Sequence, residues 1–388
     1  MQSNDTSRTL LPISCHICRR SPLAVLATIS PLVASDIRPV DHGATIASCR
    51  SCGTIQKVTD DAWRSATEQI YEKYEVFSAD PDHEQEIFVD SSSQSRSTRL
   101  ISFMQEHMRQ PAVATLLDFG CASGLLLRAI HRAYPETRLA GLEIDMKYRD
   151  RVCSIADRVE YFGDGHIPSG RRFDLITMSH VLEHLVDPIG ELRALRNALA
   201  EDGRLLITVP DLRTSPFDLM IADHCTHFTA ETLRAAVESA GFTIEAFSGS
   251  WLPKELTLIA RVDDGDDRQH TAVSEKEAEA LAAEAVVTDH LLWIQAQYTM
   301  LDGLKGDFAV FGSSIAAAIF GAKYRDRVLF FVDEDRSRSQ SKLLGKLIWT
   351  PEDAPNGVPL FLALPAPIAR AVATRQSSRF DMILLPAD

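Results

Sequence analysis

The stretch that decides the fold is LLDFGCASG, residues 116–124. It ends an apolar run at 115–119 and leads directly into a turn with Gly120 and Gly124, and a helical pattern follows at 124–134. Glycine lets a backbone approach a ligand closely, and the unpaired amides at the start of a helix offer hydrogen-bond donors. The stretch therefore predicts a small-molecule site at the end of a buried strand. Its spacing, G-x-x-x-G, differs from the G-x-G-x-x-G of a dinucleotide-binding turn.

Apolar runs and helical patterns alternate around this turn. Thr229 can cap a later helix that stops at Gly241, and the runs at 243–247 and 256–261 then predict an antiparallel closing pair. The alternation predicts an α/β fold, a parallel sheet with helices on both faces. The expected strands are residues 115–119, 138–144, 159–162, 173–178 and 204–209, and the expected helices between them are 124–134 and 189–199.

The same residues resemble the class I S-adenosylmethionine-dependent methyltransferases, which have a Rossmann-like sheet. The D-x-G-x-x-x-G loop begins at Asp118, and the second strand reads LAGLEID at 139–145. Gly163 and Asp164 follow the third strand, and FDLI at 173–176 leads into VLEHL at 181–185.

The resemblance implies that S-adenosylmethionine binds at these positions. Glu143 is expected to take the ribose hydroxyls in a bidentate contact, and Asp164 to lie beside the adenine. Glu183 and His184 are expected to shape the pocket wall, not to act in acid–base chemistry. The implied cofactor-binding residues are Asp118, Gly120, Cys121, Ala122, Gly124, Glu143, Ile144, Gly163, Asp164 and Ser179.

Four of the seven cysteines form two C-x-x-C pairs, Cys15 with Cys18 and Cys49 with Cys52. Each pair can form a tight knuckle, and four thiolates complete a tetrahedral zinc site with no open position. We therefore predict a structural zinc ion, because such pairs in a reducing compartment bind metal more readily than they form disulfides. His16, inside the first knuckle, is expected to face solvent. Redox use of the pairs is the alternative.

Composition predicts a soluble globular protein of two to three domains: the 388 residues are 45% hydrophobic and 24% charged. The net charge of -14 argues against nucleic acid as a partner. No long apolar run and no basic-then-apolar start is present, so neither a membrane span nor a signal peptide is expected, and we predict a cytoplasmic protein. The oligomeric state does not follow from the sequence.

Five segments are expected along the chain. A capping box from Ser274 to Glu277 opens a long helix that runs to about Gly303. The expected segments are a zinc-binding module at 10–60, a helical connector that contributes to the active site at 61–110, the cofactor-binding domain at 111–262, a linker with the long helix at 263–304, and a smaller C-terminal Rossmann-like α/β domain at 305–388.

This domain order resembles the sugar C-methyltransferases of deoxysugar pathways. The resemblance is carried by CRSCGTIQ at 49–56, IYEKY at 70–74, FGSS at 311–314 and FVDED at 331–335. It implies a small-molecule substrate, a nucleotide-linked keto-sugar held between the methyltransferase domain and the C-terminal domain. The turn at 311–314 suits a nucleotide-like ligand, although a purely structural turn is the alternative. The chain departs from that family at 222–224, where a tyrosine and a glutamate precede the histidine in the sugar enzymes, so the methylated atom stays open.

The candidate catalytic residues lie in DHCTHFT, residues 223–229, on the loop after the fifth parallel strand. Methyl transfer is a displacement that needs an aligned nucleophile and, for a hydroxyl or an acidic carbon, removal of a proton. Histidine suits that role because its ordinary pKa lies near neutrality. We predict that His224 acts as the general base or contacts the substrate, with a satisfied structural histidine as the alternative, and that the carboxylate of Asp223 tunes or orients an imidazole nearby. His227 is a further candidate, and a structural role is its alternative.

Three functions remain open at this stage, in addition to that of a dinucleotide-dependent oxidoreductase, which a comparison of NAD with S-adenosylmethionine as stabilising ligands would decide. The first is a methyltransferase that acts on a sugar or sugar-like metabolite. The second is an oxygen- or nitrogen-methyltransferase that acts on another small molecule. The third is a non-catalytic scaffold that retains the cofactor fold. The intact loop at 118–124 and the acids that follow it argue against the third, because a scaffold does not need cofactor ligands.

Overall fold

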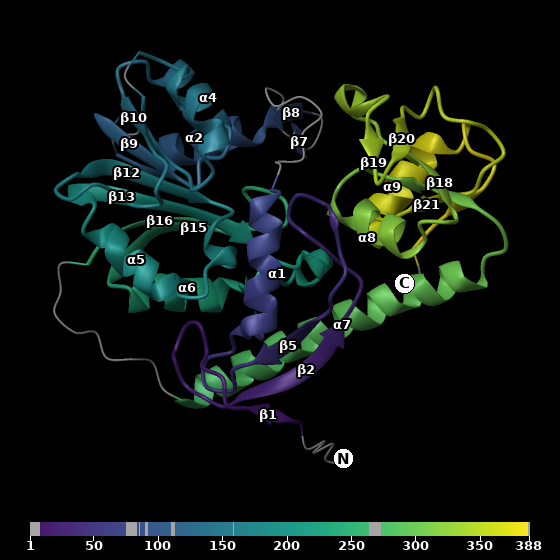
Figure 1. Ribbon diagram of the computed structural model, residues 1–388, viewed down its shortest axis with the longest axis horizontal. Coiled ribbons are helices and arrows are strands. Elements are labelled where there is room, and N and C mark those ends of the chain that lie inside the picture. Colours follow the sequence, from purple (N-terminus) through teal and green to yellow (C-terminus); the bar gives the residue numbers. More distant parts are fainter. Residues whose placement is uncertain are drawn as a thin grey trace.

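The computed structural model describes residues 8–74, 84, 86–89, 92–109, 113–157, 159–263 and 273–386. These residues form three main sheets, which follow one another along most of the chain (Figure 1). A long helix, α7, lies beneath the first sheet and leads to the third.

The N-terminal sheet is antiparallel, with the order β1-β2-β5-β6-β14. Its last strand, β14, comes from far later in the chain and places Thr226 opposite Gln56 and His227 opposite Ile55. A loop of the central unit is therefore part of the N-terminal sheet. The strands are β1 Leu10–Leu11, β2 Leu23–Ile29, β5 Ala44–Ser48, β6 Ile55–Lys57 and β14 Thr226–His227, with a separate ladder of β3 Leu32–Val33 and β4 Pro39–Val40.

The connector consists of two capped helices with a short hairpin between them. The side chain of Asp60 accepts a hydrogen bond from the amide of Trp63 at the start of α1, and Ser95 caps α2 in the same way. These caps fix the starts of two helices within the helical connector that the sequence predicts at 61–110. The elements are α1 Asp61–Glu72, β7 Glu86–Val89, β8 Ser92–Ser95 and α2 Arg96–His107.

The central sheet has seven strands in the order β11-β10-β9-β12-β13-β16-β15. The strands from β11 to β13 run parallel, and β16 is antiparallel to both of its neighbours. The chain leaves β9 towards β10 on one side and returns as β12 on the other, and ligands bind at such a switch point in α/β sheets. The strands are β9 Thr115–Phe119, β10 Arg138–Leu142, β11 Glu160–Phe162, β12 Phe173–Ser179, β13 Leu199–Pro210, β15 Phe242–Ser248 and β16 Glu255–Val262.

Helices cover both faces of this sheet, as the sequence predicted. Leu116 packs with Leu127 of α3 on one face. Leu117 packs with Leu192 of α5 and Leu233 of α6 on the other. The helices are α3 Leu125–Ala133, α4 Arg149–Cys153, α5 Pro188–Arg196 and α6 Ala230–Ser239, with 3₁₀ turns η1 Met146–Tyr148, η2 Leu182–His184 and η3 Pro216–Met220.

One boundary differs from the expectation. The helix predicted to 199 ends at Arg196, and β13 begins at Leu199 instead of 204. Leu199 already pairs with Phe173, and the register then shifts so that Arg204 pairs with Leu175. This irregular start hides the strand from a periodicity argument.

Helix α7 (Val273–Gly303) connects the other units. Its buried residues, including Val287 and Tyr298, share one apolar cluster with Ile46 of the N-terminal sheet and Phe320 of the C-terminal unit. The predicted capping box at its start cannot be assessed, because the Ser274 side chain lies outside the described residues. No helix in the described ranges is both long and apolar enough to cross a membrane.

The C-terminal sheet has the order β19-β20-β18-β17-β21-β22 and is parallel except for β19. Its two central strands, β18 and β17, span residues 328–332 and 308–311 of the segment predicted as an α/β domain. The hairpin of β19 and β20 and helix α9 were not predicted. The elements are β17 Phe308–Phe311, α8 Ile315–Lys323, β18 Val328–Val332, η4 Arg336–Arg338, β19 Lys342–Leu343, β20 Lys346–Trp349, β21 Leu360–Leu362, α9 Ala366–Gln376 and β22 Ile383–Leu384.

Candidate functional site

The glycine turn between β9 and α3 has a backbone that only glycine adopts easily. Gly120 has φ +77°, and a Cβ there would lie 2.3 Å from Cγ2 of Val181. Gly124 has φ +78° and is the N-terminal cap of α3. The Gly120 amide donates to the carbonyl of Leu142, 2.8 Å away, which fixes the turn against the end of β10. The turn is thus an open cradle of backbone at the switch point of the sheet.

Glu143 folds back over this cradle. Its Oε2 accepts a hydrogen bond from the Ala122 amide at 3.1 Å, and its Oε1 accepts one from the Asp145 amide at 3.2 Å. Burial raises the pKa of Glu143, and these amides act against the rise. Each carboxylate oxygen retains a lone pair for a further donor. Such a carboxylate can accept hydrogen bonds from the ribose hydroxyls of S-adenosylmethionine, and the glycine cradle beside it leaves room for the methionine group.

The other predicted cofactor residues lie around the glycine turn and Glu143. Burial raises the pKa of Asp118 to about 7, and its Oδ1 accepts a hydrogen bond from the hydroxyl of Thr177 at 2.7 Å. Cys121 is buried with its sulfur against Gly141, so only its backbone can reach a ligand. Ser179, the last residue of β12, accepts a hydrogen bond from Nη1 of Arg96 at 2.9 Å.

Two apolar side chains that follow β10 are exposed near Glu143. Ile144 is 61% exposed, and Met146, which the sequence analysis overlooked, is 55% exposed. A Cβ on Gly163 would lie 2.1 Å from the sulfur of Met146, so a side chain there would displace this flexible methionine. Asp164 is exposed, and its Oδ1 accepts a hydrogen bond from the amide of His166.

The four knuckle cysteines converge on one point. The sulfurs of Cys15 and Cys52 are 3.5 Å apart, as are those of Cys18 and Cys49, and all four lie within 4.8 Å of one another. Sulfurs bound tetrahedrally to zinc at about 2.3 Å lie about 3.8 Å apart. The set therefore fits a zinc ion.

The prediction that His16 faces solvent is wrong. His16 is 2% exposed, its Nδ1 lies 2.8 Å from the hydroxyl of Thr226, and its amide donates to the side chain of Gln56. The knuckle packs against β14, and this contact covers the residue between the cysteines. The knuckle thus contacts the loop that holds the candidate catalytic residues.

Two histidines of that loop share one buried carboxylate, that of Asp218 in η3. Nδ1 of His224 lies 2.6 Å from Oδ1 of Asp218, and Nδ1 of His227 lies 2.5 Å from Oδ2. Burial favours the neutral acid, but the two imidazoles hold the pKa of Asp218 well below its usual value. The sequence analysis missed Asp218, because nothing in its spacing within a short 3₁₀ turn points to the histidines.

Asp218, not the predicted Asp223, is the carboxylate that orients His224. Asp223 accepts hydrogen bonds from the amide and hydroxyl of Ser35, and its Oδ2 lies 3.3 Å from Nδ1 of His184. Asp223 therefore contacts His184 and not His224, the next residue in the sequence, since the chain turns between residues 223 and 224. Burial opposes the charge of His184, yet the hydrogen bond that His184 donates to Asp223 raises the pKa of this histidine.

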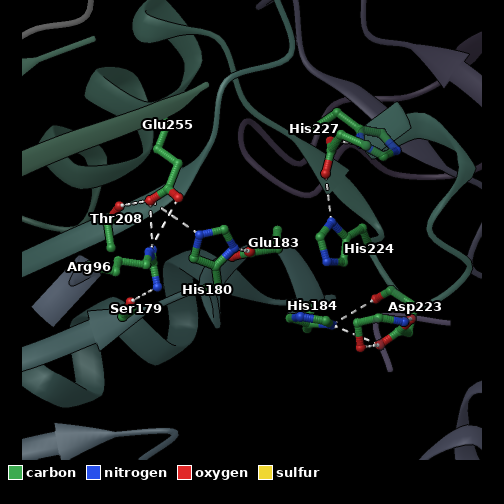
Figure 2. Close-up of polar contacts among 12 residues, drawn as sticks. Arg96, Ser179, His180, Glu183, His184, Thr208, Asp223, His224, His227 and Glu255 are labelled. Atoms are coloured by element: carbon green, nitrogen blue, oxygen red, sulfur yellow. Dashed lines mark hydrogen bonds and ion pairs between the residues drawn. The ribbon is translucent and has the colours of Figure 1, made fainter. Parts of the chain in front are cut away.

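Glu183 and His184, which the sequence assigned to the pocket wall, lie inside the titratable cluster (Figure 2). The ring of His184 meets that of His224 edge-on, with centroids 4.5 Å apart. Glu183 is 1% exposed, and its Oε1 forms an ion pair with Nδ1 of His180 at 3.1 Å, whereas its Oε2 has no hydrogen-bond partner among the described residues. Ligand atoms of Glu183, His184 and His224 lie within 4.8 Å of one another, so the trio can exchange protons or hold a cation.

His180 is a further candidate that the sequence analysis missed. It follows the end of β12 with φ +54°, a conformation that a residue other than glycine adopts only under strain. Its Nδ1 lies 3.1 Å from Oε1 of Glu183 and its Nε2 3.3 Å from Oε2 of Glu255. Burial and the charge of Arg96 oppose protonation, but the two carboxylates raise the pKa of His180 to about 9. His180 is therefore a cation at neutral pH.

Arg96 and Glu255 hold this cation in place. Nη2 and Nε of Arg96 donate to the two oxygens of Glu255 at 2.6 and 3.2 Å, and the hydroxyl of Thr208 donates to Oε2 at 3.0 Å. Figure 2 shows the group beside the pair of His184 and Asp223. His180 lies directly after β12, at the edge where parallel strands border a ligand. This position is the signal that could have identified it from the sequence.

Comparison with known proteins now adds to this geometry. Residues 92–246 match a family described as a methyltransferase domain. This part of the chain is an S-adenosylmethionine-dependent methyltransferase domain. The predicted cofactor class and the Rossmann-like parallel sheet are therefore confirmed. The matched residues include neither the cysteine knuckles nor the C-terminal sheet.

The methyltransferase domain has similar sequences among curated proteins. Two are named ubiquinone biosynthesis O-methyltransferase. The one from Xanthomonas axonopodis pv. citri (strain 306) is 26% identical over 160 residues, which are 36% of this chain and 67% of that protein. The one from Xanthomonas oryzae pv. oryzae (strain PXO99A) is 31% identical over 124 residues, which are 28% of this chain and 48% of that protein. The chain thus spans between about half and two thirds of the length of these relatives.

Solved structures also resemble the methyltransferase domain. The mitomycin 7-O-methyltransferase is 24% identical, with a TM-score of 0.37 over 43% of this chain and 53% of that one. An S-adenosylmethionine-dependent methyltransferase from Clostridium acetobutylicum is 11% identical, with a TM-score of 0.35 over 43% of this chain and 90% of that one.

The cysteine cluster leads to a prediction about metal content. We expect the purified protein to hold about one zinc ion per chain, and Cys49→Ser to lose it and melt at a lower temperature, because a structural zinc site contributes directly to folding. Plasma mass spectrometry and thermal unfolding measure both effects. Cys153→Ser, at an exposed cysteine outside the cluster, is the control. Zinc-free protein whose cysteines titrate as reversible disulfides would establish the redox alternative. A second metal equivalent that Glu183→Gln removes would assign a cation to the trio.

The charge of His180 leads to a prediction about how the free energy of unfolding depends on pH. Its pKa of about 9 in the folded chain exceeds the unfolded value of about 6.5. The stabilisation from its charge is therefore complete below pH about 6.5 and is lost as the pH rises through about 9. We expect His180→Asn to lower the free energy of unfolding by on the order of 1 kcal/mol more at pH 6 than at pH 9.5, a discounted figure because the side chain is 33% exposed.

Urea unfolding at the two pH values measures this difference. His166→Asn, at an exposed histidine outside the cluster, is the control and should show no such pH dependence. A loss of stability that is the same at both pH values would mean that the charge of His180 does not contribute.

Proposed function

We propose that this chain transfers the methyl group of S-adenosylmethionine to a small-molecule acceptor, a nucleotide-linked sugar or a sugar-like metabolite, and that His224 removes the acceptor's proton. The observation that carries the proposal is the place of the histidine cluster in the fold. Val181 contacts the glycine turn at Gly120, and Glu183 and His184, two and three residues further, lie against His224. The cofactor cradle and the histidine cluster are thus joined by one short segment.

The cofactor would lie along the switch point of the sheet, held by the turn at 120–124 and by Glu143. When bound, S-adenosylmethionine supplies an electrophilic methyl group. Ile144 and Met146 would cover the adenine, because they are exposed apolar side chains beside that carboxylate.

The chain's own residues would then accept one proton and stabilise one developing negative charge. His224, with Nδ1 bonded to Asp218, presents Nε2 as a lone pair that accepts the acceptor's proton. Both N–H groups of His180 are paired, with Glu183 and Glu255, so this residue would act through its positive charge, which stabilises the negative charge that grows on the acceptor oxygen.

The C-terminal unit is proposed to hold the nucleotide part of the acceptor. Gly312, at the end of β17, has φ +96° and open space where a side chain would stand. The hydroxyl of Ser313 donates to Asp333 at 2.5 Å, and Nη1 of Arg338 lies 2.8 Å from the same hydroxyl. A positive-φ glycine and an arginine at the end of a parallel strand suit a phosphate group.

Methylation of an oxygen on a different small molecule is the second candidate. The names of the curated relatives, which are O-methyltransferases, favour it. The buried Ala222 and the aspartate at 223 also differ from the tyrosine and glutamate of the sugar enzymes.

One experiment separates these readings. The protein is incubated with S-adenosylmethionine and, in separate reactions, a nucleotide-linked keto-sugar, the same sugar without the nucleotide, and a phenol. Release of S-adenosylhomocysteine gives turnover, and NMR of the product locates the methyl group. We expect turnover with the nucleotide-linked sugar only. Turnover with the phenol alone supports the second candidate. Binding of the cofactor without any turnover across a wide panel of acceptors supports the scaffold.

A further inference from the structure

Lys57, the last residue of β6, is a fully buried lysine. Lysine is almost never fully buried unless its charge is paired. Its Nζ donates to the carbonyls of Ile221 and His224 at 2.7 and 2.6 Å and lies 3.4 Å from Nε2 of His227. Its amide donates to the carbonyl of Cys225. One residue of the N-terminal sheet thus holds the loop at 221–225.

The contact with His227 fixes where the protons lie. An ammonium group only donates, so the nitrogen facing it, Nε2 of His227, must carry the lone pair. Nδ1 of His227 then carries the proton and donates to Asp218. Burial and next the charge of Lys57 lower the pKa of His227 to about 4, so this ring is neutral at physiological pH. Burial lowers the pKa of Lys57 itself to about 8, which leaves it charged at neutral pH.

A neutral His227 leaves the negative charge of Asp218 available to His224. Because Oδ1 of Asp218 lies 2.6 Å from Nδ1 of His224, that nitrogen carries a proton and Nε2 is the free lone pair. We propose that Lys57 is a positioning residue for methyl transfer, which sets through His227 and Asp218 the nitrogen of His224 that accepts the acceptor's proton. The inference rests on the proposed role of His224 as the base.

Other charged groups also face these histidines, but each has a partner of its own. Glu183 pairs with His180, and Asp223 binds Ser35 and His184. Within the described residues, the groups that influence His224 or His227 are Lys57 from β6, Asp218 from η3, Glu183 and His184 from η2, Asp223 and Cys225 of the loop itself, and His16 of the first knuckle.

The test uses the full chain with ¹⁵N-labelled histidine and needs no acceptor. Two-bond ¹H–¹⁵N spectra report which ring nitrogen is protonated, and His224→Asn and His227→Asn assign the signals. We expect both rings in the wild type to carry their proton on Nδ1, and His227 to stay neutral down to pH about 5. Lys57→Met keeps the stem and removes the charge, so the pKa of His227 should rise by on the order of one unit. Lys323→Met, in the C-terminal unit, should leave these signals unchanged.

A proton on Nε2 of His224 in the wild type, or an unchanged titration of His227 in Lys57→Met, overturns the inference. The wild-type spectrum decides by itself if Lys57→Met does not fold. A lysine that only ties the loop would hold the carbonyls without affecting the titration of His227, so this readout separates the two roles.

The effect on catalysis follows with the acceptor that gives turnover in the panel above. In Lys57→Met a protonated His227 would neutralise Asp218 at higher pH than in the wild type, so the acid limb of the kcat profile should move up by on the order of one pH unit, while the Kd for S-adenosylmethionine is unchanged. In a His227→Asn background the same substitution should no longer move the acid limb of the pH profile. A shift that persists there contradicts the relay. If His224→Ala keeps its turnover, the proposed base fails, whereas the proton positions seen by NMR still test Lys57.

Discussion

His224→Ala is expected to lower kcat by at least about 100-fold, because a general base contributes roughly 10²–10⁴-fold to a rate. The lone pair that accepts the acceptor's proton is lost, and the buried charge of Asp218 loses one of its two imidazole partners. The affinity for S-adenosylmethionine should stay nearly unchanged, because the glycine turn and Glu143 lie elsewhere. Steady-state release of S-adenosylhomocysteine and calorimetric titration of the cofactor measure the two quantities.

Two variants make this result specific. Asp218→Asn keeps the size of the side chain but removes its charge, so it should reproduce much of the loss in kcat. His166→Ala removes an exposed histidine outside the cluster and should leave kcat unchanged. Near-wild-type turnover in His224→Ala would remove His224 from the mechanism, and loss of cofactor binding would make its role structural.

The cofactor half of the site could be predicted because its signals are local. A strand, a glycine turn and a helix follow one another within twenty residues, and the strand expected at 115–119 is β9 Thr115–Phe119. Glu143 returns to that turn because parallel neighbours such as β9 and β10 end at the same edge of the sheet. The cysteine pairs were found in the same way, because each knuckle is a local turn.

The catalytic half depends on contacts that no local pattern records. Lys57 reaches His227 across 170 positions of sequence, and β14 is a two-residue strand without periodicity. Adjacency in sequence even indicated the wrong partner, since Asp223 precedes His224 but contacts His184. His16 was assigned to solvent because the packing of the knuckle on β14 is a tertiary contact. Buried polar groups must find partners wherever the fold places them, and only the structure shows which.

Gly120→Arg is expected to abolish measurable binding of S-adenosylmethionine. The residue has φ +77°, and even a Cβ would lie 2.3 Å from Cγ2 of Val181, so any side chain must displace Val181 or the turn itself. The arginine would then extend into the cradle where the cofactor lies, and the amides of the turn would no longer face a ligand. The surrounding sheet should persist, because Gly120 lies after the last residue of β9 and not within the ladder.

Isothermal titration with S-adenosylmethionine measures the affinity, and circular dichroism with thermal unfolding shows that the fold remains. Gly303→Arg is a matched control, because that glycine has open space around it at the end of α7. If Gly120→Arg does not fold, Gly120→Ala still meets Val181 and should weaken binding by at least about tenfold, which corresponds to about 1.4 kcal/mol. Unchanged affinity in a folded Gly120→Arg protein would show that the turn is not the cofactor site, and the position of Glu143 beside it would then need another explanation.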